Sequence, residues 1–380
     1  MDFKMTEEQE LLLEGLREVI ARYGSEEYFR ECDENHRYPT EWMKAMTDNG
    51  FGLLGVPEEY GGTSVDTLTL MLVTEEATRL GCPSYFLGRA LYIDDMMRFG
   101  SEEQKKVTME YALKGEYSFC LGFTEPQSGS DSTAITATAT RKNGKVYING
   151  NKTFITGADK VPYMLCMTRD LESTKTPYES CTLWWVPMNA QGIKVVPLNK
   201  VGWHMKNTCE VFLDNVEIEE KDIVGKEGEG FKNLMHNFEI ERLQMAAGAL
   251  GQAQCAFEDA IRYANQRVQF GKTIGSFQLI QEKLCDMAIK IKNMKNFVYQ
   301  TAWEKDNGIP INVSAALCKL YCAQAGFEVI DDAMQILGGI GYTDVRVSRM
   351  WRDSRVNRIG GGTDQIMIHV AGRALLKQYK

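Results

Sequence analysis

Two glutamates and an arginine stand close together in the segment Phe238-Glu239-Ile240-Glu241-Arg242. A carboxylate can accept or release a proton, and an apolar environment raises its pKa towards the range that suits general acid–base catalysis. Most glutamates on helices are nevertheless solvated and pair with neighbouring cations. These residues alone therefore leave two interpretations open, a catalytic carboxylate at Glu241 or a surface ion pair.

Five short clusters rich in glycine, hydroxyl residues and glutamine are further candidates for ligand binding. They are Thr124–Asp131, Lys152–Gly157, Asn265–Lys272, Gln335–Gly341 and Gly360–Gln365. Glycine lets a ligand approach backbone N–H groups closely, and free N–H groups at a helix start favour phosphate or carbonyl oxygens. Each cluster alone is equally typical of turns or sheet packing. No GxGxxG motif follows a strand, which argues against a Rossmann domain.

Composition excludes several classes of protein. The 380 residues suggest two or three domains, and the net charge of −9 disfavours nucleic-acid binding. Four histidines and the absence of a CxxC pair predict no metal site, and the ten cysteines are expected to be reduced and buried. The N-terminal segment is acidic and amphipathic, and no apolar run reaches membrane-spanning length. We expect a cytoplasmic protein without a membrane span.

The elements that must position these residues change in type along the chain. Thr6–Gln9 and Ser101–Gln104 have the pattern of a capping box, and another helix is expected to begin at Pro39-Thr40. Residues 51–62 are rich in glycine and proline and predict a loop. Residues 1–116 are therefore predicted to form an N-terminal helical domain.

A β domain is predicted at residues 117–226. Asn143-Gly144 and Asn149-Gly150 bracket a short β-rich run, and each pair is expected to form a turn. Phe154 and Thr156 follow two residues apart, so they should share one face of a strand. Further strands are expected to begin at Tyr163, Cys181, Ile193 and Cys209.

Helical periodicity returns in residues 227–380 and predicts a bundle of four or more long helices. These helices are expected to begin near Gly230, Phe277, Ser314 and Asp364. Arginine also recurs every third residue, at Arg346, Arg349, Arg352, Arg355 and Arg358. A spacing of three drifts around a helix, so structural ion pairs or a subunit interface are favoured over one anion-binding face.

Taken in order and with this α–β–α pattern, the five clusters resemble the acyl-CoA dehydrogenase family from end to end. TEPQSGSD and FITG resemble its two flavin loops, QRVQFG the stretch that reaches the FAD of a neighbouring subunit, and QILGGIGY and GGTDQ the remaining signatures. The implied fold is mainly α with an inserted β domain: an N-terminal helical domain, a central antiparallel β-barrel and a C-terminal four-helix bundle. The closest resemblance is to crotonobetainyl-CoA reductases and related acyl-CoA reductases, including the caffeoyl-CoA reductase type.

The resemblance also implies FAD as cofactor, a homo-oligomer, in particular a tetramer, and roles for individual residues. Thr124 and Thr156 would hydrogen-bond the flavin, Phe154 would pack against it, and Ser130 would lie beside the pyrophosphate and the CoA arm. Thr363 is expected to cap the last helix and to complete the nucleotide site. The remaining implied FAD contacts are Phe123, Gly129, Gln365 and, from a second subunit, Arg267, Phe270, Gln278, Gln335, Gly338 and Gly339.

The catalytic base of many relatives is a glutamate directly before the glycine of an EGT motif, and here that position is Gly361. A minority of the family carries the base on the first long helix of the bundle, before an arginine, and Glu241 matches that place. Gly361 would keep its backbone N–H as an oxyanion donor. Asp364, close to Gly361 in sequence, is the competing carboxylate and is expected to cap a helix or to pair on the surface. The implied substrate contacts are Ser130, Phe238, Glu239, Arg242, Gly360 and Gly362.

The predicted function is that of a 2-enoyl-CoA reductase acting on crotonobetainyl-CoA or an arylacrylyl-CoA such as caffeoyl-CoA. The resemblance implies that an electron-transferring flavoprotein supplies the electrons. The alternatives are a short-chain acyl-CoA dehydrogenase working oxidatively, an oxidase that reduces O₂, and a flavin- and CoA-binding subunit without turnover. The loss of the usual glutamate at position 361 motivates the last alternative, and Glu241 argues against it.

Overall fold

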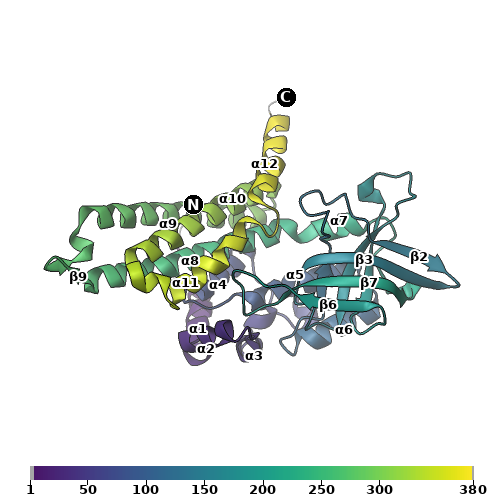
Figure 1. Ribbon diagram of the computed structural model, residues 1–380, viewed down its shortest axis with the longest axis horizontal. Helices are drawn as coiled ribbons and strands as arrows, with labels where there is room; N and C mark the ends of the chain where they lie inside the picture. The colour runs from purple at the N-terminus through teal and green to yellow at the C-terminus, as the bar shows by residue number, and fades with distance from the viewer. Residues whose placement is uncertain (1–3, 379–380) are drawn as a thin grey trace.

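The computed structural model describes residues 4–378. Along the chain, a helical region precedes the β domain and another follows it. Figure 1 shows the β domain at one end of the long axis and the hairpin of β9 at the other. The N-terminal helices are α1 Glu7–Tyr23, α2 Glu26–Glu34, α3 Thr40–Asp48, α4 Thr67–Arg79, α5 Arg89–Phe99 and α6 Glu102–Ala112.

Both predicted capping boxes begin helices in the structure. Thr6 Oγ1 accepts from the N–H of Gln9 at 3.2 Å, and the Gln9 side chain accepts from the N–H of Thr6 at 3.0 Å. Ser101 and Gln104 exchange the same pair of hydrogen bonds at the start of α6. The predicted loop at 51–62 contains two short 3₁₀ turns, Phe51–Leu53 and Glu58–Tyr60.

The β domain consists of two four-stranded sheets, both inside the described part of the chain, with the orders β1-β4-β5-β8 and β2-β3-β7-β6. The pairs are antiparallel, except that β1 runs parallel to β4, so the expected all-antiparallel pairing is wrong there. The strands are β1 Phe119–Gly122, β2 Thr138–Lys142, β3 Lys145–Thr156, β4 Tyr163–Arg169, β5 Cys181–Pro187, β6 Ile193–Pro197, β7 Thr208–Ile218 and β8 Ile223–Val224.

Only one of the two predicted Asn-Gly turns exists. Asn143 and Gly144, with φ of 52° and 75°, connect β2 to β3 as expected of a two-residue hairpin turn. Asn149-Gly150 lies inside β3, and its register with β7 shifts: Ile148 pairs with Val216 but Gly150 pairs with Leu213, so β7 carries the extra residue of a bulge opposite Asn149. Gly150 also packs closely within the domain, because a Cβ there would lie 2.5 Å from the Cβ of Ala137. A turn at this point was the wrong prediction.

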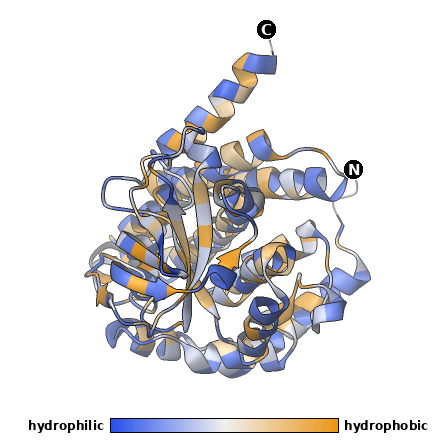
Figure 2. Ribbon diagram, turned by 90° about the vertical axis from the view of Figure 1, so that its right-hand side faces the viewer, coloured by the Kyte–Doolittle hydropathy of each residue, from blue (hydrophilic) through white to orange (hydrophobic). Residues whose placement is uncertain are grey.

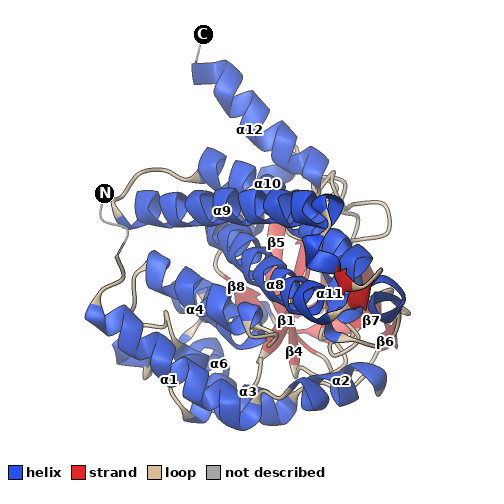
Figure 3. Ribbon diagram, turned by 90° about the vertical axis from the view of Figure 1, so that its left-hand side faces the viewer, coloured by secondary structure: helices blue, strands red, loops and turns tan. Residues whose placement is uncertain are grey.

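The C-terminal region packs three long helices together, α8 Phe238–Gln266, α9 Gln278–Asp306 and α10 Asn312–Leu337 (Figure 3). The helix expected near Gly230 is interrupted, because α7 (Gly230–Leu234) is followed by a 3₁₀ turn at Met235–Asn237. Shorter helices α11 (Arg346–Ser354) and α12 (Asp364–Gln378) follow, and a small hairpin of β9 Val268–Gln269 and β10 Lys272–Thr273 joins α8 to α9.

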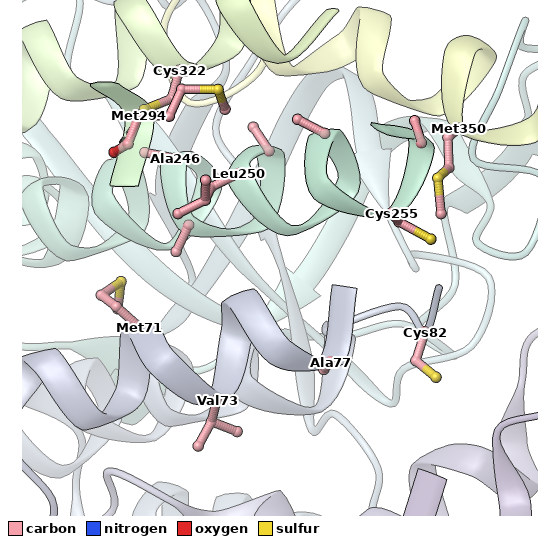
Figure 4. Packing of buried hydrophobic residues seen from close by; sticks show 14 of the residues in the cluster. Met71, Val73, Ala77, Cys82, Ala246, Leu250, Cys255, Met294, Cys322 and Met350 are labelled. Atoms are coloured by element: carbon pink, nitrogen blue, oxygen red, sulfur yellow. Dashed lines mark hydrogen bonds between the residues drawn. The ribbon is translucent and has the colours of Figure 1, made fainter. Parts of the chain in front are cut away.

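The largest hydrophobic core joins the N-terminal helices to this bundle. In Figure 4, Met71 of α4 points toward α8, while Met294 of α9 and Cys322 of α10 approach α8 from the other side. α12 extends away from the rest of the protein and carries both hydrophobic and hydrophilic residues along its length (Figure 2). Helix α8 is therefore covered along its sides, and its N-terminal end meets the β domain.

The segment Asn312–Tyr342, whose most apolar 18-residue window has a mean hydropathy of 1.2, is long and apolar enough to cross a membrane. The expectation that no apolar run reaches that length is therefore wrong for the described residues. More than half of its most apolar window is buried in the protein, because α10 packs against α8, α9 and α12. Burial within the bundle explains the hydrophobicity of this helix.

The arginines spaced by three form ion pairs with carboxylates of the same chain. Arg346 pairs with Asp259, Arg349 with Glu26, Arg352 with Asp33 and Arg358 with Asp364, at 2.6 to 2.8 Å. The ion-pair interpretation is therefore confirmed for these four arginines. All ten cysteines are free, as expected, and nine are buried, but Cys285 is exposed.

Candidate active site

The N-terminal turns of α8 carry Glu241 and Arg242 into a half-buried position. Burial raises the pKa of the Glu241 carboxyl, and the positive charges of Arg242 and Lys319 oppose that rise. A carboxyl whose pKa is raised in this way can hold a proton closer to neutral pH than a solvated glutamate. Its environment therefore suits proton exchange better than surface pairing.

Gly361 lies beside this carboxylate, as the sequence predicted for a displaced base. A Cβ built at Gly361 would stand 3.9 Å from Oε1 of Glu241 and 2.6 Å from Sδ of Met245. Gly361 also has a φ of 62°, in the left-handed region that favours glycine. Glu241 and Gly361 thus share one small space, although they are 120 positions apart in the sequence.

The loop that contains Gly361 is held from two sides. Thr363 Oγ1 accepts from the N–H of Ile366 at 3.2 Å, which confirms Thr363 as the cap of α12. Asp364 is 4% exposed, and its Oδ2 accepts from Arg358 at 2.8 Å and from Gln324 at 3.0 Å. The expected surface position of Asp364 is therefore wrong: it forms a buried ion pair because the start of α12 packs against α10.

Helix α5 supplies a second wall of the same region. Burial raises the pKa of Tyr92 well above its usual value, and the negative charge of Glu241 adds to the rise. The pKa of Asp95 is raised to about 8, first by burial and then by Asp94, with a smaller contribution from Glu241. The side chain of Asn237, just before α8, donates to the Asp95 carboxyl at 2.8 Å.

Arg242 has its guanidinium 5.8 Å from the centre of the Phe238 ring. Its Nε is buried without a hydrogen-bond acceptor in the described part of the chain. Burial lowers the pKa of Arg242, and Glu241 and Glu239 partly offset this effect. An unsatisfied guanidinium N–H beside a candidate base is suited to an acceptor that comes from outside the chain.

The two predicted flavin loops adjoin each other in the β domain. The N–H of Thr153 donates to the carbonyl of Thr124 at 2.9 Å. Beneath this contact, Lys152 Nζ donates to Glu125 at 2.7 Å, and both side chains are almost fully buried. Burial tends to raise the pKa of Glu125, but Lys152 and the N–H groups of Thr136 and Ala137 lower it overall.

Phe154 projects from this arrangement with 66% of its surface exposed. Its φ of 58° and a register shift between Lys152 and Ile155 interrupt the strand alternation that was expected to place Phe154 and Thr156 on one face. Gly129 and Gly339 have open space where a Cβ would stand, and neither has a positive φ. Packing within the described chain therefore does not require glycine at these two positions, whereas a closely bound ligand would.

The residues expected to reach a second subunit lie far from Glu241. Arg267 follows the last residue of α8, so it lies roughly 40 Å along the helix from Glu241 at 1.5 Å per residue. Figure 1 shows the β9 hairpin beside Arg267 at the opposite end from the β domain. All the residues assigned to this role are exposed, namely Arg267, Phe270, Gln278, Gln335, Gly338 and Gly339.

Three residues of the region were missed from the sequence: Lys319, Met245 and Asp95. Lys319 had a usable signal, because it is a lysine at helical spacing from Ala315, Cys322 and other residues of a buried helix face. Met245 had none, since a methionine on an apolar helix is ordinary core. Asp95 follows Asp94 in α5, and nothing in this pair of acids distinguishes Asp95 from a solvated carboxylate.

Comparisons with known proteins agree with this arrangement over nearly the whole chain. Models of the acyl-CoA dehydrogenase N-terminal, middle and C-terminal domains match residues 6–116, 120–216 and 228–376. The probable acyl-CoA dehydrogenase YdiO of Escherichia coli K12 is 58% identical over 382 residues, covering all of both chains. The chain belongs to the acyl-CoA dehydrogenase family. It is an oxidoreductase acting on the CH–CH group of acyl-CoA thioesters.

Solved structures show the same fold. Acyl-CoA dehydrogenase from Geobacillus kaustophilus is 28% identical with a TM-score of 0.91, covering 99% of this chain and 100% of its own. A chain from a structure of the electron transferring flavoprotein of Acidaminococcus fermentans, studied for flavin-based electron bifurcation, is 31% identical with a TM-score of 0.90 and the same coverage. The predicted order of helical, β and helical regions in this acyl-CoA dehydrogenase is therefore confirmed.

Proposed function

We propose that this acyl-CoA dehydrogenase is an FAD-dependent 2-enoyl-CoA reductase that uses Glu241 as its proton donor and acceptor. The observation that carries the proposal is the position of the Glu241 carboxylate, 3.9 Å from where a side chain at Gly361 would begin. The family's usual glutamate would occupy that place. A carboxylate contributed from α8 thus compensates for the glycine in the loop.

FAD fits the residues that are present. The exposed ring of Phe154 offers a flat apolar surface, and we assign the hydrogen bonds to the flavin to the hydroxyl groups of Thr124 and Thr156 in the two adjoining loops. Gly129 leaves space for a close approach of the ligand to the backbone. When bound, FAD supplies hydride exchange with the β-carbon of the acyl group. We assign the neighbouring-subunit contacts to Arg267, Phe270, Gln278, Gln335 and the Gly338-Gly339 backbone.

The chain's own groups account for the proton step. In the reductive direction Glu241 delivers a proton to the α-carbon, and in the oxidative direction it removes one. Negative charge develops on the thioester oxygen in both directions, and the N–H of Gly361 is the proposed donor to it. The unsatisfied Nε of Arg242 is the proposed contact for an acceptor on the CoA arm.

Glu241→Gln tests the assignment. Because Gln keeps the shape but cannot exchange a proton, we expect a loss in kcat of about 10²- to 10⁴-fold with FAD content and CoA-ester binding retained. Asp364→Asn is the comparison, since that carboxylate is committed to Arg358 and Gln324. We expect Asp364→Asn to keep activity within about tenfold per folded subunit. Normal turnover by Glu241→Gln in anaerobic flavin-reduction assays would reject the assignment.

The proposed substrates are crotonobetainyl-CoA or an arylacrylyl-CoA such as caffeoyl-CoA. A Cβ at Gly360 would be in ordinary contact with Val356 O at 3.7 Å and Met245 Cε at 3.8 Å, so the position tolerates a side chain, and glycine leaves the space of that side chain free. An anaerobic titration with a panel of enoyl- and acyl-CoAs, followed by the flavin absorbance, identifies both the acyl group and the direction. A kcat/KM for crotonyl- or butyryl-CoA that equals or exceeds that for every larger ester would contradict this assignment.

An electron-transferring flavoprotein is the proposed electron donor. The likeness to a chain from the Acidaminococcus fermentans electron transferring flavoprotein structure supports it. The second candidate function is a short-chain acyl-CoA dehydrogenase working oxidatively, favoured by the likeness at 29% identity and a TM-score of 0.89 to butyryl-CoA dehydrogenase from Megasphaera elsdenii. Turnover with an electron-transferring flavoprotein, measured in both directions, separates the two candidates.

A further inference from the structure

Helix α10 carries a lysine on its buried face, directly behind the loop of Gly361. Lys319 is 0% exposed, and its helical neighbours Ala315, Cys318 and Cys322 are equally buried. Burial lowers its pKa to about 8, and the nearby charges that modify this value belong to Asp364, Arg242 and Glu241. Burying an ammonium group costs free energy unless the group is hydrogen-bonded or paired, so the contacts of Lys319 are informative.

One contact of Lys319 is to the backbone of the active-site loop. Its Nζ donates to the carbonyl of Gly362 at 2.6 Å. Gly361 and Gly362 have φ of 62° and 101°, conformations that glycine adopts readily and that leave the loop free to take other shapes. The hydrogen bond from Lys319 fixes the carbonyl that directly follows Gly361, and so restricts where the N–H of Gly361 points.

A second connection is electrostatic. Among the described residues Lys319 forms no ion pair with a carboxylate within 4.0 Å, so no direct partner neutralises its charge. The Glu241 carboxylate lies 3.9 Å from a Cβ built at Gly361, the residue before the carbonyl that Lys319 binds, and the Lys319 charge favours the ionised form of Glu241 against the effect of burial. Arg242, on the same helix as Glu241, acts in the same direction, and Asp364 lies on the other side, at the start of α12.

We propose that Lys319 is a positioning residue that holds the Gly360–Gly362 loop against α10 and stabilises the negative charge of Glu241. One buried side chain thereby aligns the oxyanion donor and the base, which come from different elements. The inference rests on the proposed role of Glu241 in proton exchange. In this proposal Lys319 touches neither substrate nor cofactor. It orients the N–H of Gly361 and the carboxylate of Glu241, the two groups that contact the substrate.

Substitutions at Lys319 separate the hydrogen bond from the charge. Lys319→Gln keeps a donor for the Gly362 carbonyl and removes the charge, Lys319→Met removes both, and Lys319→Arg keeps the charge. Gln324→Leu is the matched control, because Gln324 also lies on α10 and donates to Asp364 but carries no charge. All four proteins are assayed for FAD content, unfolding midpoint, kcat and KM across pH.

Two readouts distinguish positioning from a merely structural role. In Lys319→Met we expect kcat to fall about a hundredfold, the effect of a misplacement of roughly 1 Å, with a much smaller change in KM. In both neutral variants the pKa of Glu241 should rise, because a favourable positive charge is gone. The limb of the kcat–pH profile that reports Glu241 should therefore move to higher pH. Gln324→Leu should lower the unfolding midpoint but leave this limb at its wild-type pH.

Infrared difference spectra of the Glu241 carboxyl, assigned with Glu241→Gln, measure the same titration without turnover. An unchanged Glu241 titration in Lys319→Gln would overturn the inference even if Glu241→Gln is inactive. If Glu241→Gln is fully active, the proposed function fails, and the infrared titration still decides whether Lys319 acts on Glu241. If both neutral variants fail to fold, Lys319→Arg decides: a lower kcat with an unchanged titration supports the loop contact, and wild-type kcat rejects it.

Discussion

Gly361 is the residue that separates this chain from relatives with a glutamate in the loop. Its φ of 62° and the sulfur of Met245, 2.6 Å from a built Cβ, make the position unsuitable for a longer side chain. A non-glycine residue in the left-handed region costs about 1–2 kcal/mol, and Met245 would also have to move. Glycine at position 361 thus leaves room for the side chains of Glu241 and Met245, which α8 places beside the loop.

Moving the carboxylate back to the loop tests this adaptation. In the Glu241→Gln background, we expect Gly361→Glu to recover little activity, because the new side chain meets Met245. Adding Met245→Ala should raise kcat further by removing that obstruction. Steady-state kinetics of the double and triple variants check the order. Full recovery in the double variant would show that Met245 does not limit the space at position 361.

Asp95 gives a pH dependence of stability with a definite sign. Its pKa in the folded protein, about 8, is above the unfolded value of about 3.9, so the native state binds the extra proton between those values. The wild-type protein therefore loses stability as pH rises through this window. Asp95→Asn cannot ionise, and its advantage over wild type should grow with pH. Urea unfolding midpoints measured at several pH values check this, and a constant difference would contradict it.

At the scale of elements, one buried ion pair connects the two flavin loops. Glu125 and Lys152 are 1% and 0% exposed, whereas Lys145 of the same strand β3 pairs with Glu219 at 3.0 Å with both side chains about half exposed. Breaking a buried pair costs about 3–5 kcal/mol, because it strands the remaining charge. An exposed pair contributes about 1 kcal/mol or less.

We therefore predict that Lys152→Met destabilises the protein by about 3–5 kcal/mol and weakens FAD retention. Lys145→Met is the control and should change the unfolding free energy by less than about 1 kcal/mol. Chemical denaturation, with flavin fluorescence to follow FAD release, measures both quantities. Equal effects of the two substitutions would show that the ion pair does not organise the loops.

Elements set by local signals could be predicted, and those set by contacts across the fold could not. The capping boxes at Thr6 and Ser101 and the turn at Asn143-Gly144 depend on hydrogen bonds or φ angles within four residues. The bulge opposite Asn149-Gly150 depends on the pairing with β7, a strand that comes later in the chain. The parallel pairing of β1 with β4 likewise depends on where the chain returns, which no local pattern contains.

For the whole molecule, the resemblance suggested which elements supply the proposed site, but no local pattern contains the contacts between those elements. Glu241 was singled out as the candidate base because a glycine replaces the usual acid at position 361, a comparison that resemblance makes possible. The burial of Lys319 could have been predicted from its helix face, but its contact with the Gly362 carbonyl, 43 positions away, could not. Pairings between distant segments become visible only when the bundle brings α8, α10 and the loop together.

The FAD site that we propose needs residues from more than one chain. Phe270 is 93% exposed at the tip of the β9–β10 hairpin, and Leu279 at the start of α9 is 76% exposed. α12 adds exposed Ile368 and Leu376 where it extends from the body. Large apolar side chains gathered at such ends are typical of surfaces that another subunit covers. Since Arg267 lies roughly 40 Å along α8 from Glu241, its flavin contact requires a second chain.

We therefore predict that Phe270→Asp disrupts the oligomer and lowers FAD retention together. Burying the introduced carboxylate in an apolar contact costs free energy because no partner compensates for its lost hydration. FAD retention should fall as well, because the same hairpin would carry Arg267 to the neighbouring flavin. Leu171→Asp is the control, because Leu171 is 53% exposed in a loop of the β domain outside the proposed interface. Light scattering combined with flavin absorbance measures mass and FAD per chain. A monomer that retains FAD and full activity would show that the site is complete within one chain.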